Sequence, residues 1–199
     1  MNQQFLDAFT LANVGSGFRT VNAPKSRVDG AEFEFKVKAT DDLEFDASLG
    51  LMDSAYEELS LHATSRPIPT GLPPCCVGNK LIQAPNYNAS LEVNWRFMRT
   101  RSGDLHAVLN GNVYGKQYFD AFNTERIAQG AYGLYNARIA LDPADKRGFT
   151  ADVWVKNLGN EKYLAYGLNQ NDPDTGAIGF DYALVGEPRT YGVNFGYRY

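Results

Sequence analysis

Strict alternation of apolar and polar residues recurs along most of this chain, and it constrains the fold more than any other feature. In residues 190–199 one side of the predicted strand holds valine and aromatic residues, namely Tyr191, Val193, Phe195, Tyr197 and Tyr199. The other side holds small or polar residues, namely Thr190, Gly192, Asn194, Gly196 and Arg198. Because successive side chains of a strand point to opposite faces, this pattern is typical of a strand with lipid on one side and water on the other.

The same alternation predicts strands further upstream. Residues 31–37 carry charges on one side only, and residues 43–51 repeat the pattern after the polar turn at 40–42. These two segments predict a hairpin. The other predicted strands are 89–97, 105–115, 131–141 and 149–155, with a weaker one at 4–11. We therefore expect about eight strands in all.

The predicted connections alternate in length. Short ones fall at 40–42, 99–104 and 142–148, and long ones at about 12–30, 53–87, 116–130 and 157–189. Outer-membrane barrels have short turns on the periplasmic side and long loops outside the cell, so this rhythm favours such a barrel. A soluble β-sandwich also alternates apolar and polar residues, but it predicts no regular alternation of loop length.

Composition limits the alternatives. No stretch approaches the roughly 18 consecutive apolar residues of a membrane helix, so we expect any crossing of a bilayer to be made by barrel strands. The 199 residues suit one domain, which we take to span residues 1–199. A net charge of −4, with no basic stripe, argues against nucleic acid as a partner. Met1–Leu11 shows no export signal, so we expect the carboxy-terminal piece of a longer precursor.

Three segments resemble TonB-dependent outer-membrane receptors. GEPRTYGVNFGYRY, from Gly186 to Tyr199, is similar to the carboxy-terminal strand of those receptors. VWVKNLGNEKYLAYG, Val153 to Gly167, is similar to their penultimate strand and the pattern after it, and VNAPKSRVDGAEFEF, Val21 to Phe35, is similar to a strand entry. Three positions carry the pattern of the second segment: Asn157, Leu158 and Tyr163.

The resemblance implies an all-β, antiparallel transmembrane barrel. A whole receptor of this kind has a plug domain and roughly 22 strands, of which this chain would supply about the last eight, without the plug. The implied parent lies in the outer membrane of a Gram-negative cell. It imports a scarce ligand such as a ferric siderophore, cobalamin or a carbohydrate, with energy passed from TonB through the plug. No cofactor is implied.

The carboxy-terminal apolar row, which comprises Tyr191, Val193, Phe195, Tyr197 and Tyr199, has two expected roles. Aromatic rings anchor barrel strands at the level of the lipid headgroups. The resemblance adds that the barrel-assembly machinery recognises a terminal aromatic strand as a sorting signal. Pro188 cannot donate to a β-ladder, so with Glu187 and Arg189 it marks the point where the preceding loop enters the strand.

The charged residues on the polar side of the strands would line a wet interior. They are Glu32, Glu34, Lys36, Glu44, Asp46, Glu92, Arg96, Arg138, Asp152 and Lys156. A solvated strand face explains any single one of them without a binding role. No nucleophile elbow, phosphate loop or paired carboxylates occur, so we expect no enzymatic activity.

Other polar side chains give no site. Cys75 and Cys76 are adjacent in a proline-rich loop and lack metal-binding spacing, because neighbouring side chains diverge. An oxidising compartment would allow a vicinal or intermolecular disulfide, and we expect a structural role in the loop over redox chemistry. His62 and His106 lack partner spacing. The loop oxygens of Asn169, Asn171, Asp172 and Asp174 suit calcium chemically but lack the spacing of a calcium loop, so we expect a solvated turn.

Two other interpretations remain open at this stage. Eight strands can close a narrow barrel, so the chain could be a complete small outer-membrane barrel. It could also be a soluble β-sandwich that serves as a binding module. A barrel fragment, in contrast to both, should have two unpaired sheet edges.

Overall fold

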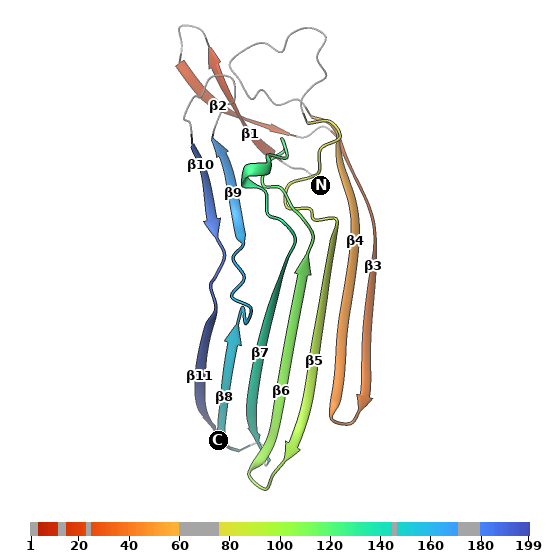
Figure 1. The fold of residues 1–199 in the computed structure, drawn as a ribbon, viewed down its shortest axis with the longest axis vertical. Coiled ribbons are helices and arrows are strands. Elements are labelled where there is room, and N and C mark those ends of the chain that lie inside the picture. The colour runs from red at the N-terminus through yellow and green to blue at the C-terminus, as the bar shows by residue number, and fades with distance from the viewer. Residues whose placement is uncertain (1–3, 12–14, 23–24, 60–75, 145–146, 171–179) are drawn as a thin grey trace.

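The computed structural model consists almost entirely of antiparallel strands (Figure 1). It describes residues 4–11, 15–22, 25–59, 76–144, 147–170 and 180–199, and only the backbone for 4–11, 15–22 and 170. The strands are β1 (Gln4–Leu11), β2 (Gly15–Asn22), β3 (Lys25–Thr40), β4 (Leu43–Glu58), β5 (Tyr87–Arg99), β6 (Gly103–Tyr114), β7 (Tyr132–Pro143), β8 (Gly148–Lys156), β9 (Leu164–Gln170), β10 (Phe180–Val185) and β11 (Thr190–Arg198). A single-turn helix, η1, spans Glu125–Ile127. No helix in these ranges is long and apolar enough to cross a membrane.

Seven strands form one sheet in the order β11-β8-β7-β6-β5-β4-β3. Each neighbouring pair is antiparallel, and the chain steps from strand to strand as a meander between β3 and β8. The predicted segments coincide, to within one residue at their ends, with parts of these strands or with β1, so the predicted all-β, antiparallel class is confirmed. Leu91 of β5 pairs with Ala47 on one side and Gly111 on the other, so apolar and small residues share one face.

The two edge strands of this sheet, β3 and β11, each have one neighbour within the described residues. Six antiparallel steps separate them, so both strands run in the same direction, as their arrows show in Figure 1. An antiparallel barrel contains an even number of strands, so these two edges cannot pair with each other to close one. The expectation of two unpaired edges is confirmed for this part of the chain.

Three strands occur where the sequence predicted only loops. β2 lies in the predicted loop 12–30, and β9 and β10 lie in 157–189, so those loop assignments were wrong in part. β1 pairs with β2 and β9 with β10 as separate two-stranded sheets at the end of the molecule opposite the short turns. β9 and β10 do alternate, with exposed Tyr166, Leu168, Phe180 and Tyr182, but each spans only six or seven residues and was counted as part of a long loop.

Short polar turns join the strands at the other end. In the turn between β3 and β4, the backbone N–H of Asp42 donates to Oγ1 of Thr40 over 3.2 Å. In the next one, Oγ1 of Thr100 donates to the carbonyl of Gly103 over 2.7 Å. A Cβ atom on Gly103 would lie 2.1 Å from the carbonyl oxygen of Asp142, so only glycine permits this approach to β7.

The principal cluster of buried side chains joins the far end of β4 to the segments that follow it, away from the short turns. This loop-end core consists of Tyr56, Leu59, Cys76, Leu81 and Ala121. The large side chains on the apolar face of the sheet remain exposed, with Phe35 at 61% and Phe195 at 83%. No second sheet covers that face in the described ranges, so the expectation of a β-sandwich is not supported.

Candidate functional surfaces of the sheet

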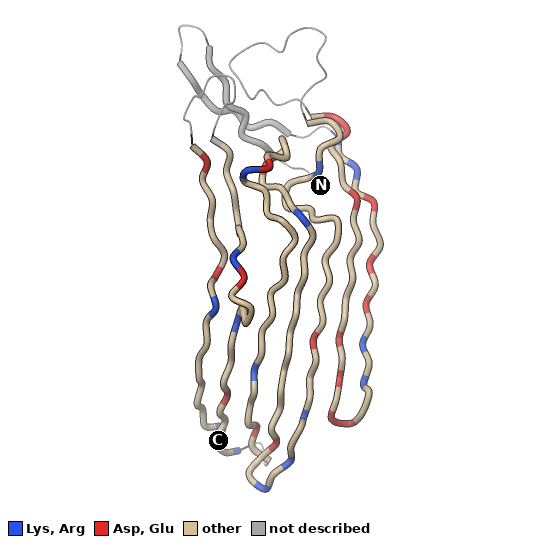
Figure 2. The backbone as a smooth tube through the Cα atoms, in the orientation of Figure 1, with Lys and Arg blue, Asp and Glu red and all other residues tan. Residues whose placement is uncertain are grey.

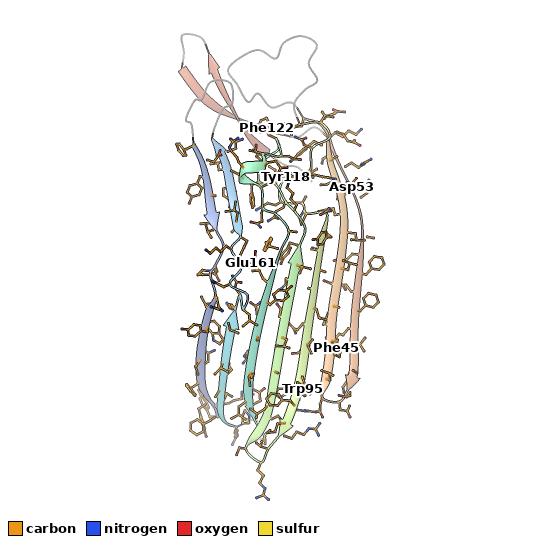
Figure 3. All side chains as sticks on the ribbon, viewed as in Figure 1. Phe45, Asp53, Trp95, Tyr118, Phe122 and Glu161 are labelled. Atoms are coloured by element: carbon orange, nitrogen blue, oxygen red, sulfur yellow. The ribbon has the colours of Figure 1, made fainter. Side chains whose placement is uncertain are left out.

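The apolar face carries aromatic and branched side chains from every strand of the sheet, several of them visible in Figure 3 with Phe45 and Trp95 labelled. Among its exposed members are Phe33, Phe35, Val37, Leu49, Leu51, Leu91, Trp95, Leu109, Tyr135, Ile139, Phe149 and Val153. A soluble domain rarely leaves so large a contiguous apolar surface uncovered. The face is therefore built to contact something apolar.

The carboxy-terminal apolar row lies on this same face. Four of its members belong to β11 and Tyr199 follows directly after it; Tyr191 is 82% exposed and Tyr199 is 97% exposed. The rings of Tyr197 and Phe149 meet edge to face, with centroids 5.1 Å apart. The row is thus positioned by pairing with β8 and still presents its rings outward.

Charged residues occur along the strands at both sides of the sheet (Figure 2), and the ion pairs below assign several of them to the opposite, polar face. Lys36 of β3 lies 2.7 Å from Oε1 of Glu44 and 3.4 Å from Oδ2 of Asp46 on β4. On β7 and β8, Nη2 of Arg138 donates to Asp152 over 2.7 Å. These residues were predicted to line a wet interior, and the structure places them on one face.

Neutral polar side chains link the middle of this face. The hydroxyls of Ser48 and Ser90 lie 2.7 Å apart, which connects β4 to β5. Oδ1 of Asn110 accepts hydrogen bonds from Nδ2 of Asn112 over 2.8 Å and from Nδ2 of Asn136 over 3.2 Å. The polar face therefore satisfies many of its own hydrogen-bonding groups across strands and stays wettable.

Three tyrosines form a stack above these amides. The rings of Tyr114 and Tyr132 have centroids 5.1 Å apart, and those of Tyr132 and Tyr163 lie 4.8 Å apart with 12° between their planes. A Cβ on Gly186 would lie 2.1 Å from Cζ of Tyr163, so this ring also covers the backbone just before β11. The stack connects β6 and β7 to the segment that follows β8.

Asn157 forms a clasp between β8 and the segment that leads into β11. Its side chain is buried, with the residue 5% exposed, and its φ of 50° is tolerated well by asparagine. Nδ2 donates to the carbonyls of Glu161 over 2.9 Å and Glu187 over 3.0 Å, while Oδ1 accepts from the N–H of Glu161 over 2.8 Å. The backbone N–H of Asn157 donates to Oδ1 of Asn136 over 3.0 Å, which ties the clasp to β7.

A second contact closes the same junction. The N–H of Arg189 donates to Oδ1 of Asn160 over 3.2 Å, and Nη1 of Arg189 donates to the carbonyl of Leu158 over 3.4 Å. Pro188 precedes Thr190, where β11 begins, as its missing N–H predicts. The sequence had identified Asn157, Leu158 and Tyr163 only as a pattern; their contacts with residues about 30 positions away need the fold.

The loop between β6 and β7 is held by polar contacts at the far end of the sheet, where Tyr118 and Phe122 are labelled in Figure 3. Asp120 accepts from the N–H and hydroxyl of Thr124, over 2.9 Å and 2.6 Å. Hydrogen bonds from Lys116 and Tyr118 hold the pKa of Glu125 below its usual value. Asn123 also exchanges hydrogen bonds with Lys80 of the preceding loop, so the two loops form one unit.

The remaining candidates give structural contacts. Cys76 is disulfide-bonded and buried, while Cys75 and His62 lie outside the described residues. His106 lies 3.8 Å from Asp142. Asn169 belongs to β9 and not to the expected solvated turn, and its Nδ2 donates to Oδ2 of Asp120 over 3.0 Å; residues 171–174 of that segment lie outside the described ranges. Among described residues, no group of three His, Cys, Asp or Glu could hold a metal.

Comparison with known proteins gives the context for these surfaces. Residues 2–158 match the family model for the TonB dependent receptor-like β-barrel. The chain is similar to the ferric yersiniabactin uptake receptor FyuA from Yersinia pestis, with 25% identity and a TM-score of 0.69 over 89% of this chain and 24% of that one.

Two receptors from Acinetobacter baumannii share the fold. The siderophore receptor PiuA matches with 20% identity and a TM-score of 0.63, over 98% of this chain and 24% of that one. The ferric preacinetobactin receptor BauA matches with 20% identity and a TM-score of 0.62, over 100% of this chain and 26% of that one. The chain thus spans about a quarter of the length of these receptors.

Proposed function

This chain belongs to the TonB-dependent receptor-like β-barrel family, and we propose that it forms part of the barrel wall of an outer-membrane receptor that imports a ferric siderophore. The observation that carries the proposal is the two-faced sheet, apolar on one side and polar on the other, in seven antiparallel strands. The likeness to the ferric yersiniabactin uptake receptor supports a ferric siderophore over cobalamin or a carbohydrate.

In this proposal the apolar face contacts outer-membrane lipid and the polar face lines the barrel interior. The short turns at Asp41 and Ser102 lie in the periplasm, because outer-membrane barrels keep their short turns there. The loops around Leu81 and Ala121 then face outward, where a ligand arrives. The tyrosine stack lies between those loops and the neutral amides, along the path from outside to the interior.

Energy coupling belongs to the whole receptor. We propose that TonB acts through a plug enclosed by the complete barrel, and that the polar face here surrounds part of that plug. Lys36, Arg138 and their carboxylate partners keep this face polar without free cations at those positions. The chain therefore contributes wall and outward loops to transport, and it carries no proposed catalytic group.

The carboxy-terminal apolar row takes two roles in the proposal. Its exposed rings anchor the last strand in the lipid interface, where aromatic side chains are stable. The same row serves the barrel-assembly machinery as the signal for insertion. Its support is that Tyr191, Val193, Phe195 and Tyr197 lie exposed on the apolar face of an edge strand, with the exposed Tyr199 directly after β11.

A complete small barrel is the second interpretation, and the sheet topology weighs against it. The predicted strand at 4–11 is present as β1, but it pairs with β2 outside the sheet. The seven strands of the main sheet have two edges, β3 and β11, that run in the same direction. Strands from elsewhere in the receptor are therefore needed to close the wall.

Spin labels on neighbouring residues of β5 test the membrane assignment. Val93 pairs with Phe45 and Leu109 on the apolar face, whereas Asn94 pairs with Glu44 on the polar face. In the whole receptor in lipid vesicles, a label at Val93→Cys should be quenched by a lipid-soluble agent and one at Asn94→Cys by a water-soluble agent. Equal accessibility of both labels to both agents would contradict the proposal.

Uptake in cells tests the ligand class separately. A strain that lacks its own siderophore receptors should regain growth on a ferric siderophore when it expresses the whole receptor with a functional TonB system. If the receptor instead restored growth on cobalamin or a carbohydrate, the barrel-wall assignment would stand and the siderophore assignment would be rejected.

A further inference from the structure

The alternation in β11 does not by itself fix how this strand pairs with β8. A shift of two residues keeps every side chain on its original face, because residues two apart along a strand point the same way. After such a shift Val193 takes the place of an aromatic neighbour in the apolar row, and the other face still presents glycine, asparagine or threonine. Some other contact must therefore select the register.

Trp154 of β8 supplies that selectivity. Its indole lies on the polar face, directly against Gly192 of β11, with which it is paired. A Cβ at residue 192 would lie 2.5 Å from Cζ2 and 2.7 Å from Cε2 of the ring, closer than real Cβ atoms approach other atoms. The ring therefore occupies space that only a glycine leaves open.

The two nearest alternative registers lose this fit. A shift by two residues in one direction places Asn194 opposite Trp154, and in the other direction it places Thr190 there. Both residues have a Cβ atom where the indole lies. The native hydrogen bond from Nδ2 of Asn194 to Oδ2 of Asp152, 2.8 Å long, is also broken in both.

A larger shift meets a second obstacle above β11. Moving Gly196 opposite Trp154 requires a shift by four residues, which leaves several ladder positions unpaired at the strand ends. It also pulls Glu187 away from Nδ2 of Asn157, and Arg189 away from Asn160. The Asn157 clasp thus holds the entry of β11 in the same register that Trp154 selects further along.

We propose that Trp154 seated on Gly192, together with the Asn157 clasp, sets the register of the carboxy-terminal strand. The inference deepens the proposed function by adding what determines the position of the carboxy-terminal apolar row. A shift of two residues would displace Tyr199 by about 7 Å along the strand, because each residue advances about 3.4 Å. That displacement moves its ring relative to the headgroup layer and to any strand that pairs with the free edge of β11.

Cysteine cross-linking in the assembled whole receptor reads the register directly. Val153 and Val193 are opposite one another in the native pairing, so Val153→Cys with Val193→Cys should form a disulfide on oxidation. Val153→Cys with Tyr191→Cys, or with Phe195→Cys, reports the two shifted registers. Cys76 is already disulfide-bonded, so its thiol does not compete.

We expect the native pair to dominate in the unmodified background. Gly192→Ala, and separately Trp154→Ala combined with Asn157→Ala, should raise the shifted cross-links by about threefold to tenfold, the scale of losing one aromatic contact. Adding Trp154→Ala to Gly192→Ala should restore native pairing, because the alanine no longer meets an indole and the clasp remains. The matched control is Trp95→Ala, which removes the other tryptophan of the chain from the apolar face.

Three results would overturn the inference. One is an unchanged cross-link pattern in both variants. Another is shifted cross-links of equal yield in the Trp95→Ala control. The third is loss of all cross-links in Gly192→Ala without recovery in the double variant, because a register lock leaves the ladder itself intact. None of these readouts depends on siderophore uptake or on the quenching of spin labels, so they separate this inference from the proposed function.

Discussion

Tyr163 covers Gly186 so closely that the ring leaves no room for a side chain: a Cβ there would lie 2.1 Å from Cζ of the tyrosine. The N–H of Gly186 also donates to the carbonyl of Tyr163 over 2.8 Å. Ring and backbone therefore meet at the same point, between the outward hairpin of β9 and β10 and the strand that follows it. The packing at this junction therefore requires glycine at position 186.

Gly186→Ala should therefore destabilise the receptor by about 1–3 kcal/mol, because the new methyl group displaces the ring from the tyrosine stack. Gly130→Ala is the control, since nothing lies within 4 Å of a Cβ at that position. The midpoint of unfolding in detergent measures both. Equal unfolding midpoints for the two variants would show that the Tyr163 ring can move aside without loss of stability.

Asn157 should be sensitive in a graded way. Asn157→Gly retains the left-handed backbone but loses the side-chain amide and its hydrogen bonds to Glu161 and Glu187, which costs about 1–3 kcal/mol. Asn157→Ala should be worse by about 1–2 kcal/mol, because alanine is strained at a φ of 50°. Denaturant midpoints in the order wild type, glycine, alanine would support this, and a reversed order of the two variants would contradict it.

The turn between β3 and β4 should depend on pH through Asp42. Arg99 and Arg96 donate hydrogen bonds that lower the pKa of its carboxyl, with Nη2 of Arg99 at 2.5 Å. A lowered folded-state pKa stabilises the fold above the ordinary aspartate pKa, and this contribution is lost as the pH falls through the folded value.

We therefore expect Asp42→Asn to lower the melting temperature at neutral pH and to match the wild type in strong acid, where Asp42 is protonated. Asp41→Asn is the control, because Asp41 is 88% exposed and contacts Lys38 alone among the ion pairs of this turn. Melting curves across pH check this. A difference in melting temperature between Asp42→Asn and the wild type that grows as the pH falls would contradict a stabilising role for the Asp42 carboxylate.

Neighbouring residues of β5 should respond oppositely to a positive charge. Leu91→Arg puts a guanidinium on the lipid-facing side near the middle of the strand, which costs about 2–4 kcal/mol in a bilayer. Glu92→Arg places the same group on the polar face beside Asp46, where it gains a partner. The free energy of unfolding in lipid vesicles is measured for both variants. Equal values would argue that both faces are exposed to water.

The alternation in the sequence predicted the wall well and its ends poorly. Residues 31–37 proved to be the middle part of β3, which begins at Lys25, and residues 43–51 proved to be the first part of β4, which continues to Glu58. In the parts of β3 and β4 beyond these segments, charged side chains such as Arg27 and Asp53 take positions that apolar residues hold nearer the short turn. Nη2 of Arg27 and Oδ2 of Asp53 form an ion pair at 3.2 Å. A strand outside the membrane has no lipid-facing side, so its pattern disappears although its ladder continues.

The contacts that join distant segments were beyond the reach of the sequence. Asn157 and Tyr163 stood out as part of a family pattern, but the residues that complete their contacts lie elsewhere: Asn136 belongs to β7, and Gly186 and Glu187 lie between β10 and β11. Similarly, the alternation of residues 149–155 assigns Trp154 to the polar side, but nothing in the sequence pairs it with Gly192. Periodicity assigns a residue to a face; only the register assigns its neighbour.

The common direction of β3 and β11 has a consequence for how genes of this kind can change. Each hairpin added to or removed from a barrel returns the chain to the same side of the membrane, so the orientation of every later strand is preserved. A single strand inverts all that follow and sends the outward loops into the periplasm. Insertions and deletions in this part of the barrel should therefore add or remove strands two at a time.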